Sequence, residues 1–447
     1  MSHTDDFQAQ LRAELTDLPW QRRQVTFLLG TDEFIHQEQR VALVPRHLTR
    51  LREDLGACGL DVRLFVVQGA GIRARGASGE SYEDAQYEAV GATVVSPEAA
   101  AQLDSVDVLH ALKEPTDYES HLPASFLRIG AVHLASKPPG LCRLFRAGNF
   151  AAVIDGATVG NSSYRIHRGD RTPIVGSMSR FAGSLAGRKV VEGLDLAGIT
   201  KGKVVVVGGG IAGMSAIAEM VGRADPLVVV DPWEPTRQRL AEELPRVGFP
   251  QVEVSEELTE EAMDDAVGLV FAHRTGAKKA EKVCDYDRHI RRMRKGGAIA
   301  DIAIDQGGSI AHDDFDEDDD ANQSRDKYIQ LLTPEFFYYA ETNMPREEPY
   351  EASSMHGDSS LPYVTALLAL CAHLGSPAAV VDHLLERSVR AFRGDEPVGE
   401  ATLLDCVMQD LRNGTQLAMV NGNLQATDPD IAADQQLMAW VEECRAG

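Results

Sequence analysis

Paired cysteines, long apolar runs and an excess of basic residues are missing from this sequence of 447 residues. Its six cysteines are scattered singly, without a C-x-x-C pair, which favours a reducing, cytoplasmic compartment. No apolar run reaches the roughly 18 residues of a membrane-spanning helix, and the N-terminus is polar, so we expect neither a membrane span nor a signal peptide. The net charge of −24 argues against nucleic acid or an anionic membrane as a partner. The 13 histidines show no ligand spacing, so we predict no metal site.

The rest of the composition is that of a globular protein, with 44% hydrophobic and 25% charged residues and enough length for two or three domains. Short apolar runs alternate with helical stretches, which predicts parallel sheets joined by crossover helices. We expect strands at residues 24–30, 62–68, 92–95, 106–112 and 129–135, and helices at 45–59 and 138–150. A second series begins near residue 200, after a predicted helix at 177–196. The acidic run 312–326 indicates a loop, and the chain from residue 361 onward indicates mostly helix.

A glycine-rich turn follows the four valines at 204–207. The sequence Gly208-Gly209-Gly210-Ile211-Ala212-Gly213 fits G-x-G-x-x-G in the strand–turn–helix context that dinucleotide binding requires. The first glycine allows the tight turn, the second a close approach to a pyrophosphate, and the third close packing of helix on strand. Asp231 ends the next predicted strand, where a carboxylate accepts both ribose hydroxyls of NAD and repels the 2′-phosphate of NADP. We therefore predict an NAD site here.

Three cationic or titratable side chains stand beside apolar segments of the first half. Arg40 precedes a short apolar run, and Lys113 and His133 stand at the ends of predicted strands. Because ligands of open α/β sheets bind at the carboxyl ends of strands, these side chains can converge on one site. Arginine clamps a carboxylate, lysine polarises a carbonyl and histidine transfers protons near neutral pH. Taken singly, each of the three also fits an ordinary structural role.

Residues 300–308, ADIAIDQGG, read as the end of a buried strand followed by a turn on two glycines. Asp301 and Asp305 stand on either side of three apolar residues. Side chains four positions apart on a strand point to one face, so we expect both carboxylates at the end of the sheet.

Ten segments together resemble the alanine dehydrogenase family, which shares its fold with the N-terminal part of proton-translocating transhydrogenases. They occur in family order over about residues 24–370 and are EQRVALVP, VVQGAG, SYEDAQYEAVGATVV, LKEP, VHLAS, SMSRFAG, VVVVGGGIAG, TGAKKAEKV, DIAIDQGG and TNMP. The segment DIAIDQGG is the most specific of them, and the ordered set is stronger than any single match.

The resemblance implies a role for each matching position. Arg40 would hold the substrate carboxylate, with Lys113 on the carboxylate or the keto oxygen. His133 would be the main acid/base, and Asp305 the second catalytic carboxylate. The residues that would contact NAD are Ser179, Gly208, Gly210, Ile211, Ala212, Gly213, Asp231, the segment Ile302–Asp305, Asn343 and Met344.

The resemblance also implies an architecture and a reaction. Two Rossmann-like domains with parallel sheets would flank a central cleft, with an NAD domain at 176–345 inserted into a discontinuous substrate domain. The substrate domain would comprise 1–175 and 346–447, the second part ending in a helical C-terminal extension. The reaction would be NAD-dependent oxidative deamination of a small L-amino acid, above all L-alanine to pyruvate and ammonia, or the reverse. Because the family forms hexamers, we expect a homo-oligomer, either a hexamer or a dimer.

Two other functions stay open at this point. An opine-type, saccharopine-like dehydrogenase acting on the secondary amine of two joined acids shares the Arg, Lys and His positions but lacks the DQGG text. A transhydrogenase-like or non-catalytic NAD-binding module is the alternative of another class. Transhydrogenase modules carry an Arg-Ala-Gln and Ser-Ser-Gln segment that residues 178–193 lack, and the joint presence of Arg40, Lys113, His133 and Asp305 argues against a non-catalytic module.

Overall fold

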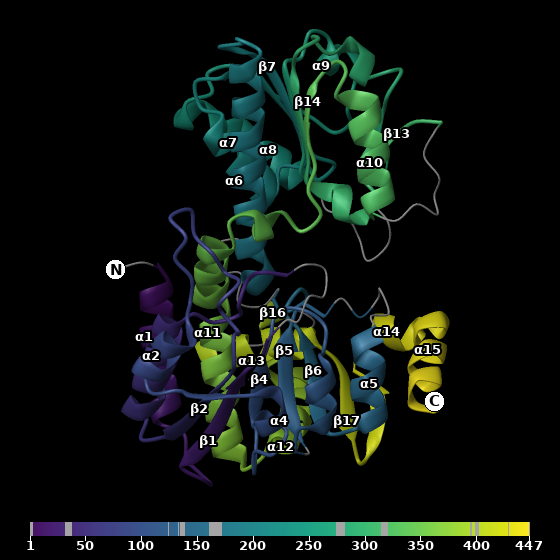
Figure 1. Cartoon of the computed structure of the whole chain (residues 1–447). Coiled ribbons are helices and arrows are strands. Elements are labelled where there is room, and N and C mark those ends of the chain that lie inside the picture. The colour runs from purple at the N-terminus through teal and green to yellow at the C-terminus, as the bar shows by residue number, and fades with distance from the viewer. Residues whose placement is uncertain are drawn as a thin grey trace. The chain divides into compact units, whose positions relative to one another are not determined.

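The computed structural model describes residues 3–31, 38–123, 125–132, 134, 139–160, 172–273, 282–313, 321–393, 396–397, 402–427 and 429–446. The chain divides into two compact units (Figure 1). Unit 1 comprises Met1–Met178 and Arg346–Gly447, and unit 2 comprises Ser179–Pro345. The first and last parts of the chain therefore fold together, and the middle part forms a unit of its own. The boundaries expected from the sequence are 175/176 and 345/346, and this division falls at 178/179 and 345/346.

Unit 1 is built on an eight-stranded sheet with the order β18-β17-β6-β5-β4-β1-β2-β3 within the described residues. Its strands are β1 Gln24–Leu29, β2 Asp61–Val67, β3 Thr93–Val95, β4 Val108–His110, β5 Phe126–Gly130, β6 Phe150–Asp155, β17 Thr415–Val420 and β18 Asn423–Ala426. Strands β1 to β6 pair in parallel, whereas β17 runs antiparallel to both β6 and β18. Parallel strands are covered on both faces, which is why their sequences are almost continuously apolar.

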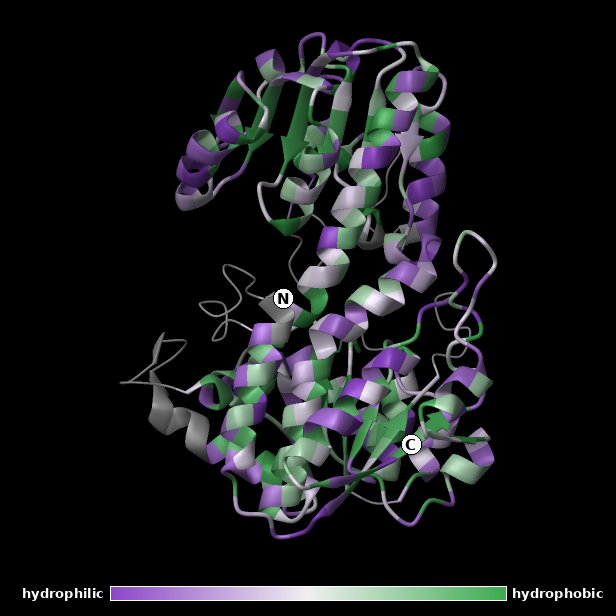
Figure 2. Ribbon diagram, turned by 90° about the vertical axis from the view of Figure 1, so that its left-hand side faces the viewer, coloured by the Kyte–Doolittle hydropathy of each residue, from purple (hydrophilic) through white to green (hydrophobic). Residues whose placement is uncertain are grey.

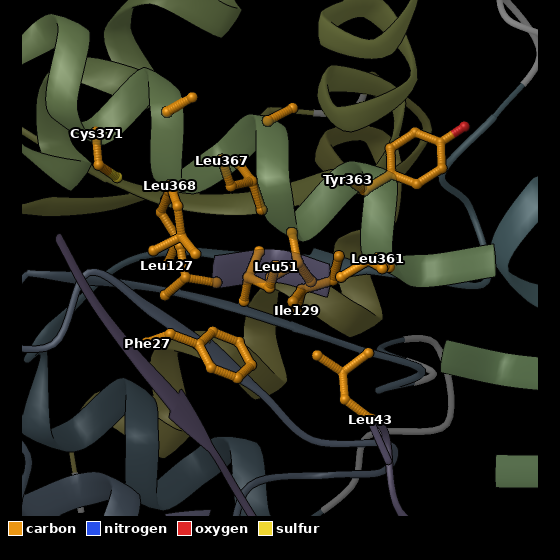
Figure 3. Close-up of a cluster of buried hydrophobic side chains, with 14 of the residues drawn as sticks. Phe27, Leu43, Leu51, Leu127, Ile129, Leu361, Tyr363, Leu367, Leu368 and Cys371 are labelled. Atoms are coloured by element: carbon orange, nitrogen blue, oxygen red, sulfur yellow. The ribbon is translucent and has the colours of Figure 1, made fainter. Parts of the chain in front are cut away.

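Helices cover both faces of this sheet. They are α1 His3–Thr16, α2 Pro45–Ala57, α3 Asp84–Ala89, α4 Pro97–Ala100, η2 Asp117–His121, α5 Pro139–Ala147, α11 Pro349–Leu374, α12 Pro377–Ala391, α13 Leu403–Gly414, α14 Pro429–Ala433 and α15 Gln435–Ala446. Successive residues of β1 serve two cores, because Phe27 belongs to the cluster that includes Leu367 of α11 (Figure 3) and Leu28 belongs to the cluster that includes Phe145 of α5. Figure 2 shows the hydrophobic residues gathered on the strands and on one side of the surrounding helices.

The C-terminal extension is mostly helical in its described residues, as expected, but it also contains a hairpin that the sequence interpretation did not include. A hairpin of β17 and β18 turns on Asn421 and Gly422, whose φ angles are 52° and 78°. An Asn-Gly pair between two strands is a strong hairpin signal, because both positions of the turn require positive φ. Helix α15 packs on α5 and is joined to it by a disulfide between Cys142 and Cys444. Two of the six cysteines are therefore bonded to each other although they are 302 positions apart in the sequence.

Unit 2 contains a parallel six-stranded sheet with the order β14-β12-β10-β7-β8-β9 within the described residues. Its strands are β7 Gly202–Val207, β8 Ala224–Val230, β9 Val252–Ser255, β10 Gly268–Phe271, β12 Ala298–Asp301 and β14 Phe337–Tyr339, with β11 Cys284–Asp285 pairing separately with β13 Ile310–Ala311. This is the doubly wound order of dinucleotide-binding sheets. The α/β fold class expected from the sequence is confirmed.

Two of the helices and 3-10 turns of unit 2 begin where the sequence predicted a strand or a loop. They are α6 Pro173–Leu196, which begins in unit 1, α7 Ile211–Glu219, α8 Glu234–Glu243, η5 Leu244–Val247, α9 Glu260–Met263, η6 Ile290–Arg292, η7 Ile302–Gln306, α10 Ala321–Leu332 and η8 Met344–Glu347 at the end of the unit. The predicted strand 297–305 ends at Asp301 and continues as the 3-10 turn η7. The acidic run 312–326 is not all loop, because α10 begins within it at Ala321.

Membrane-spanning potential is weak throughout the part of the chain that the structure describes. No single helix there is long and apolar enough to cross a bilayer. The pair formed by α11 and the first part of α12 meets the length and composition criteria jointly, but it bends by 101° at its break. The residues of α11 from Leu361 to Ala372 are buried against the sheet of unit 1, so they serve as core.

Candidate active site

The glycine turn between β7 and α7 has the geometry of a dinucleotide-binding turn. Gly208 has a φ of 102°, and a Cβ on it would lie 2.5 Å from the carbonyl oxygen of Ala272. A Cβ on Gly213 would lie 1.8 Å from the carbonyl oxygen of Gly208, so only glycine allows the helix this close to the turn. The space around a Cβ on Gly210 is open. The first N–H groups of α7 have no partner within the helix and suit a diphosphate at this open position.

Asp231, at the end of β8, faces this turn and is 9% exposed. Its Oδ2 accepts the N–H of Gly209 at 2.8 Å, and its Oδ1 accepts the N–H of Trp233 at 2.9 Å. These two bonds hold the carboxylate in place, and an ionised carboxylate has about four acceptor positions in all. The guanidinium of Arg237 donates to the carbonyl oxygen of Asp231 at 2.8 Å rather than to its carboxylate. The site therefore presents an oriented carboxylate where a ribose would bind.

Helix α6 approaches α7 closely through glycines of the segment SMSRFAG and the residues after it. A Cβ on Gly183 would lie 2.0 Å from the carbonyl oxygen of Ala212, and a Cβ on Gly187 would lie 2.5 Å from that of Ala216. This backbone contact orders the start of unit 2 against the glycine turn. Ser179, a predicted NAD contact, lies half-buried at the start of unit 2 on α6.

The segment ADIAIDQGG differs from its predicted conformation, and the expectation that both carboxylates lie on one face of a strand is wrong. Asp301 is fully buried, and its carboxylate turns back to its own chain, accepting the N–H groups of Ala303 and Ser309 at 2.9 Å each. Burial raises the pKa of Asp301 to about 6, against the lowering effect of its bonds to Ser309 and Ala303 and of the Lys282 charge. The backbone of Asp305 lies in η7, and its side chain is outside the described residues.

The segment TNMP places two further predicted NAD contacts at the end of unit 2. Asn343 has a φ of 65°, in the left-handed region that asparagine tolerates better than most other residues with a side chain. Met344 is 3% exposed and packs in the core of unit 2, and Ile302 packs against the same cluster. The side chains of Met344 and Ile302 therefore serve the core, and contacts of these two residues with NAD stay a prediction.

Arg40 and a neighbouring carboxylate form a buried ion pair in unit 1. Glu38 receives Nε of Arg40 on Oε1 at 2.8 Å and Nη2 on Oε2 at 2.7 Å. Nη1 of Arg40 contacts the sulfur of Met178 at 2.9 Å. Burial raises the pKa of Glu38, but the charges of Arg40 and Lys113 and the bonds from Arg40 outweigh it, so the pKa lies well below its usual range.

Lys113 and His133 complete the predicted substrate residues. Lys113 follows β4 and is half-buried, and its carbonyl oxygen accepts Nη2 of the buried Arg128 at 2.6 Å. Arg128 itself pairs with Glu119 at 2.7 Å, which anchors the turn after β4 to β5. Strand β5 ends at Gly130, earlier than predicted, and His133 lies outside the described residues.

Sequence reasoning did not assign a role to Glu38 or to the polar face of α11. Ser353 accepts the N–H of Val41 at 3.0 Å, which anchors the loop of Arg40 to this helix. His356 is buried with its ring 5.6 Å from that of His110, and neither of its ring nitrogens has a hydrogen-bond partner in the described part of the chain. Burial lowers the pKa of His356 well below its usual value, and the charges of His110 and Arg40 add to this effect. The E-x-R spacing could have indicated that Glu38 lies beside Arg40. No sequence pattern within α11 indicates that this helix contacts the loop of Arg40.

Comparison with known proteins agrees with this geometry. Residues 31–182 match the family model "Alanine dehydrogenase/PNT, N-terminal domain" and residues 179–395 match "Alanine dehydrogenase/PNT, C-terminal domain". An alanine dehydrogenase of Staphylococcus saprophyticus is 26% identical over 380 residues, covering 81% of this chain and 92% of that protein. Alanine dehydrogenase 2 of Staphylococcus aureus is 26% identical over 344 residues, covering 72% of this chain and 86% of that protein.

Two solved structures share the fold. An L-alanine dehydrogenase superposes with a TM-score of 0.58 at 22% identity, over 87% of this chain and all of that one. A transhydrogenase from Sinorhizobium meliloti superposes with a TM-score of 0.56 at 16% identity, over 77% of this chain and 95% of that one.

The doubly wound sheet, the glycine turn and the oriented Asp231 carboxylate define an NAD-dependent dehydrogenase. The chain belongs to the alanine dehydrogenase/PNT family, whose two domain models together span residues 31–395. The residues present fit NAD, because Gly208 and Gly213 permit a turn that no larger residue allows and Gly210 leaves the helix terminus open. No group of side chains able to hold a metal ion occurs among the described residues.

Proposed function

We propose that the protein catalyses the NAD-dependent oxidative deamination of a small L-amino acid, above all L-alanine to pyruvate and ammonia, or the reverse reductive amination. Relatives named alanine dehydrogenase, aligned over most of the chain, support this assignment. The observation that carries it is the buried Glu38–Arg40 pair in unit 1, in which the Glu38 carboxylate also interacts with the charge of Lys113.

The charges of this cluster match an anionic substrate. Arg40 and Lys113 bring two positive charges to this cluster, and both act on the Glu38 carboxylate. A guanidinium and an ammonium group are the side chains that bind the carboxylate of an amino acid or 2-oxo acid. The two bonds from Glu38 fix the plane of the Arg40 guanidinium, so a substrate carboxylate would meet a cation that is already oriented.

Each remaining residue has a proposed part in the chemistry. NAD, when bound, supplies the acceptor for the hydride that leaves the α-carbon. His133 would give and take the protons as water adds to the resulting imine and ammonia leaves, with Asp305 as its companion carboxylate. Arg40 and Lys113 would stabilise negative charge that develops on the substrate oxygens.

The cofactor would be held by unit 2. Gly208, Gly210, Ile211, Ala212 and Gly213 would hold the pyrophosphate, and Asp231 the ribose hydroxyls. Ser179, Ile302, Asn343 and Met344 are further proposed contacts. A homo-oligomer and a cytoplasmic location stay predictions.

A substrate panel tests this proposal. Purified protein is incubated with NAD and each of the common L-amino acids, and formation of NADH is followed by absorbance. The expected result is NADH formation with L-alanine, and with pyruvate plus ammonia in reverse. Activity only with a secondary amine that joins two acids would replace the proposal by the opine-type reaction. Tight NAD binding without turnover of any amino acid would refute it.

A further inference from the structure

The turn that carries Asp305 is held from one side by a buried carboxylate. Asp301 accepts the N–H of Ala303 on Oδ1 at 2.9 Å and the N–H of Ser309 on Oδ2 at 2.9 Å. The hydroxyl of Ser309 adds a bond to Oδ1 at 3.0 Å. One side chain thus joins the first and last parts of the segment 302–309.

An ammonium group holds the same turn from the other side. Nζ of Lys282 donates to the carbonyl oxygens of Gly307 at 2.6 Å and Gly308 at 3.0 Å, and to the hydroxyl of Tyr328 at 3.0 Å. Its charge also lies 5.6 Å from the centre of the Tyr328 ring. The Tyr328 hydroxyl in turn donates to the carbonyl oxygen of Ile310 at 2.5 Å, so the lysine is anchored beyond the turn as well.

The sequence of the turn shows why it needs this support. Gly307 and Gly308 have φ angles of 96° and 76°, and glycine is the residue that loses most freedom when its backbone is ordered. A Cβ on Gly308 would lie 2.5 Å from the Tyr328 ring, so a stiffer residue does not fit there. Ordering this turn therefore carries an entropic cost, which the bonds from Asp301 and Lys282 offset.

We propose that Lys282 and Asp301 are positioning residues for Asp305, because they hold the backbone of the turn 302–309 that carries it. The inference rests on the proposed catalytic role of Asp305. Lys282 lies 23 positions before Asp305 in the sequence, in the segment TGAKKAEKV, and it reaches the turn at Gly307 and Gly308 through the fold. Neither Lys282 nor Asp301 is required to touch the substrate.

The test is a double-mutant cycle between the support and the carboxylate. Lys282→Met keeps the length of the side chain and removes its donors, and it should lower kcat by roughly 10- to 100-fold, the effect of a misplaced catalytic group. In an Asp305→Asn background the same change should lower kcat by less than about twofold, because residues that act as one unit are not additive. Lys282→Arg should restore part of the loss, since a guanidinium also donates to two carbonyl oxygens.

Two further variants separate positioning from damage to the fold. Ser309→Ala removes a single bond to Asp301 and should give a smaller loss of kcat that also disappears in the Asp305→Asn background. Lys295→Met is the matched control, because Lys295 is 76% exposed and pairs at the surface with Glu335, and it should leave kcat unchanged. Losses that multiply across the cycle, or a normal kcat in Lys282→Met, would overturn the inference.

Hydrogen exchange of the backbone gives a reading that does not depend on activity. Peptides covering 302–309 should exchange faster in Lys282→Met than in the wild type or in Lys295→Met. Unchanged exchange in that peptide would overturn the inference even if kcat fell. A normal kcat in Asp305→Asn would instead refute the proposed chemistry, and the exchange experiment would still decide whether Lys282 holds the turn.

Discussion

Replacing Glu38 by Gln removes the negative charge from a pair that has almost no contact with water. The Glu38 side chain is fully buried and that of Arg40 is 4% exposed, with their closest approach at 2.7 Å. Breaking a buried pair by removing one partner typically costs about 3–5 kcal/mol, because the remaining charge stays buried without compensation. We expect Glu38→Gln to lower the free energy of unfolding by about that amount, toward the lower end because the amide oxygen can still accept the N–H groups that Oε1 accepts from Gln39 and Arg40.

The assay is chemical denaturation at neutral pH, with a surface pair as control. Glu335 pairs with Lys295 at 2.7 Å, but the two side chains are 36% and 76% exposed. Glu335→Gln should therefore cost no more than about 1 kcal/mol. Adding Arg40→Met to Glu38→Gln should recover much of the lost stability, since neither charge is then buried. If Glu38→Gln costs no more than the surface control, Arg40 is not a buried, oriented cation and the argument for carboxylate binding fails.

The same pair predicts a dependence on pH. The pKa of Glu38 is lowered in the folded state, so the unfolded chain takes up the proton first as the pH falls. The stability from Glu38 is complete above the usual glutamate range and is lost as the pH drops below it. Glu38→Gln should lose less stability than the wild type over this acid range.

Three further predictions concern the cofactor, the chemistry and the histidines of unit 1. Asp231 should make NAD bind more tightly than NADP by about 1.5–3 kcal/mol, the usual worth of a hydrogen bond to a charged group, and equal affinities in a fluorescence titration would contradict this. His133→Ala and Asp305→Asn should leave NAD affinity within a few-fold and lower turnover by about two to four orders of magnitude, whereas a His133→Ala enzyme with normal turnover would remove the mechanism. Burial lowers the pKa of His110 to about 4, against the raising effect of its bond to Ile129 and with added lowering from the charges of Arg128 and His47, so the folded state binds fewer protons than the unfolded one. Neutral His110 therefore contributes about 3 kcal/mol of stability, which is complete above about pH 6.5 and is lost as the pH falls toward 4. The free energy of unfolding of His110→Asn should be less sensitive to acid over that range than that of the wild type.

Much of the fold followed from local pattern. The alternation of apolar runs and helical stretches predicts two parallel sheets, and such periodicity reports burial directly. The glycine turn is equally local, because Gly208 and Gly213 are demanded by backbone geometry within six residues of one another. The order of the family segments then led to the family and the cofactor, since both depend on residues whose neighbours along the chain are also their neighbours in space.

Contacts between residues that are distant in sequence could not be predicted from local pattern. The hairpin of β17 and β18 joins β6 across more than 250 positions, and Cys142 reaches Cys444 across 302. Lys282 supports a turn that its own sequence neighbours do not predict. Asp305 was expected on the same strand face as Asp301 because strand periodicity was extended past Asp301, but the chain changes to a 3-10 turn there and the Asp301 carboxylate accepts backbone N–H groups. Hydrophobic pattern states which residues are buried, whereas the partner of a buried polar group depends on which elements the whole chain packs together.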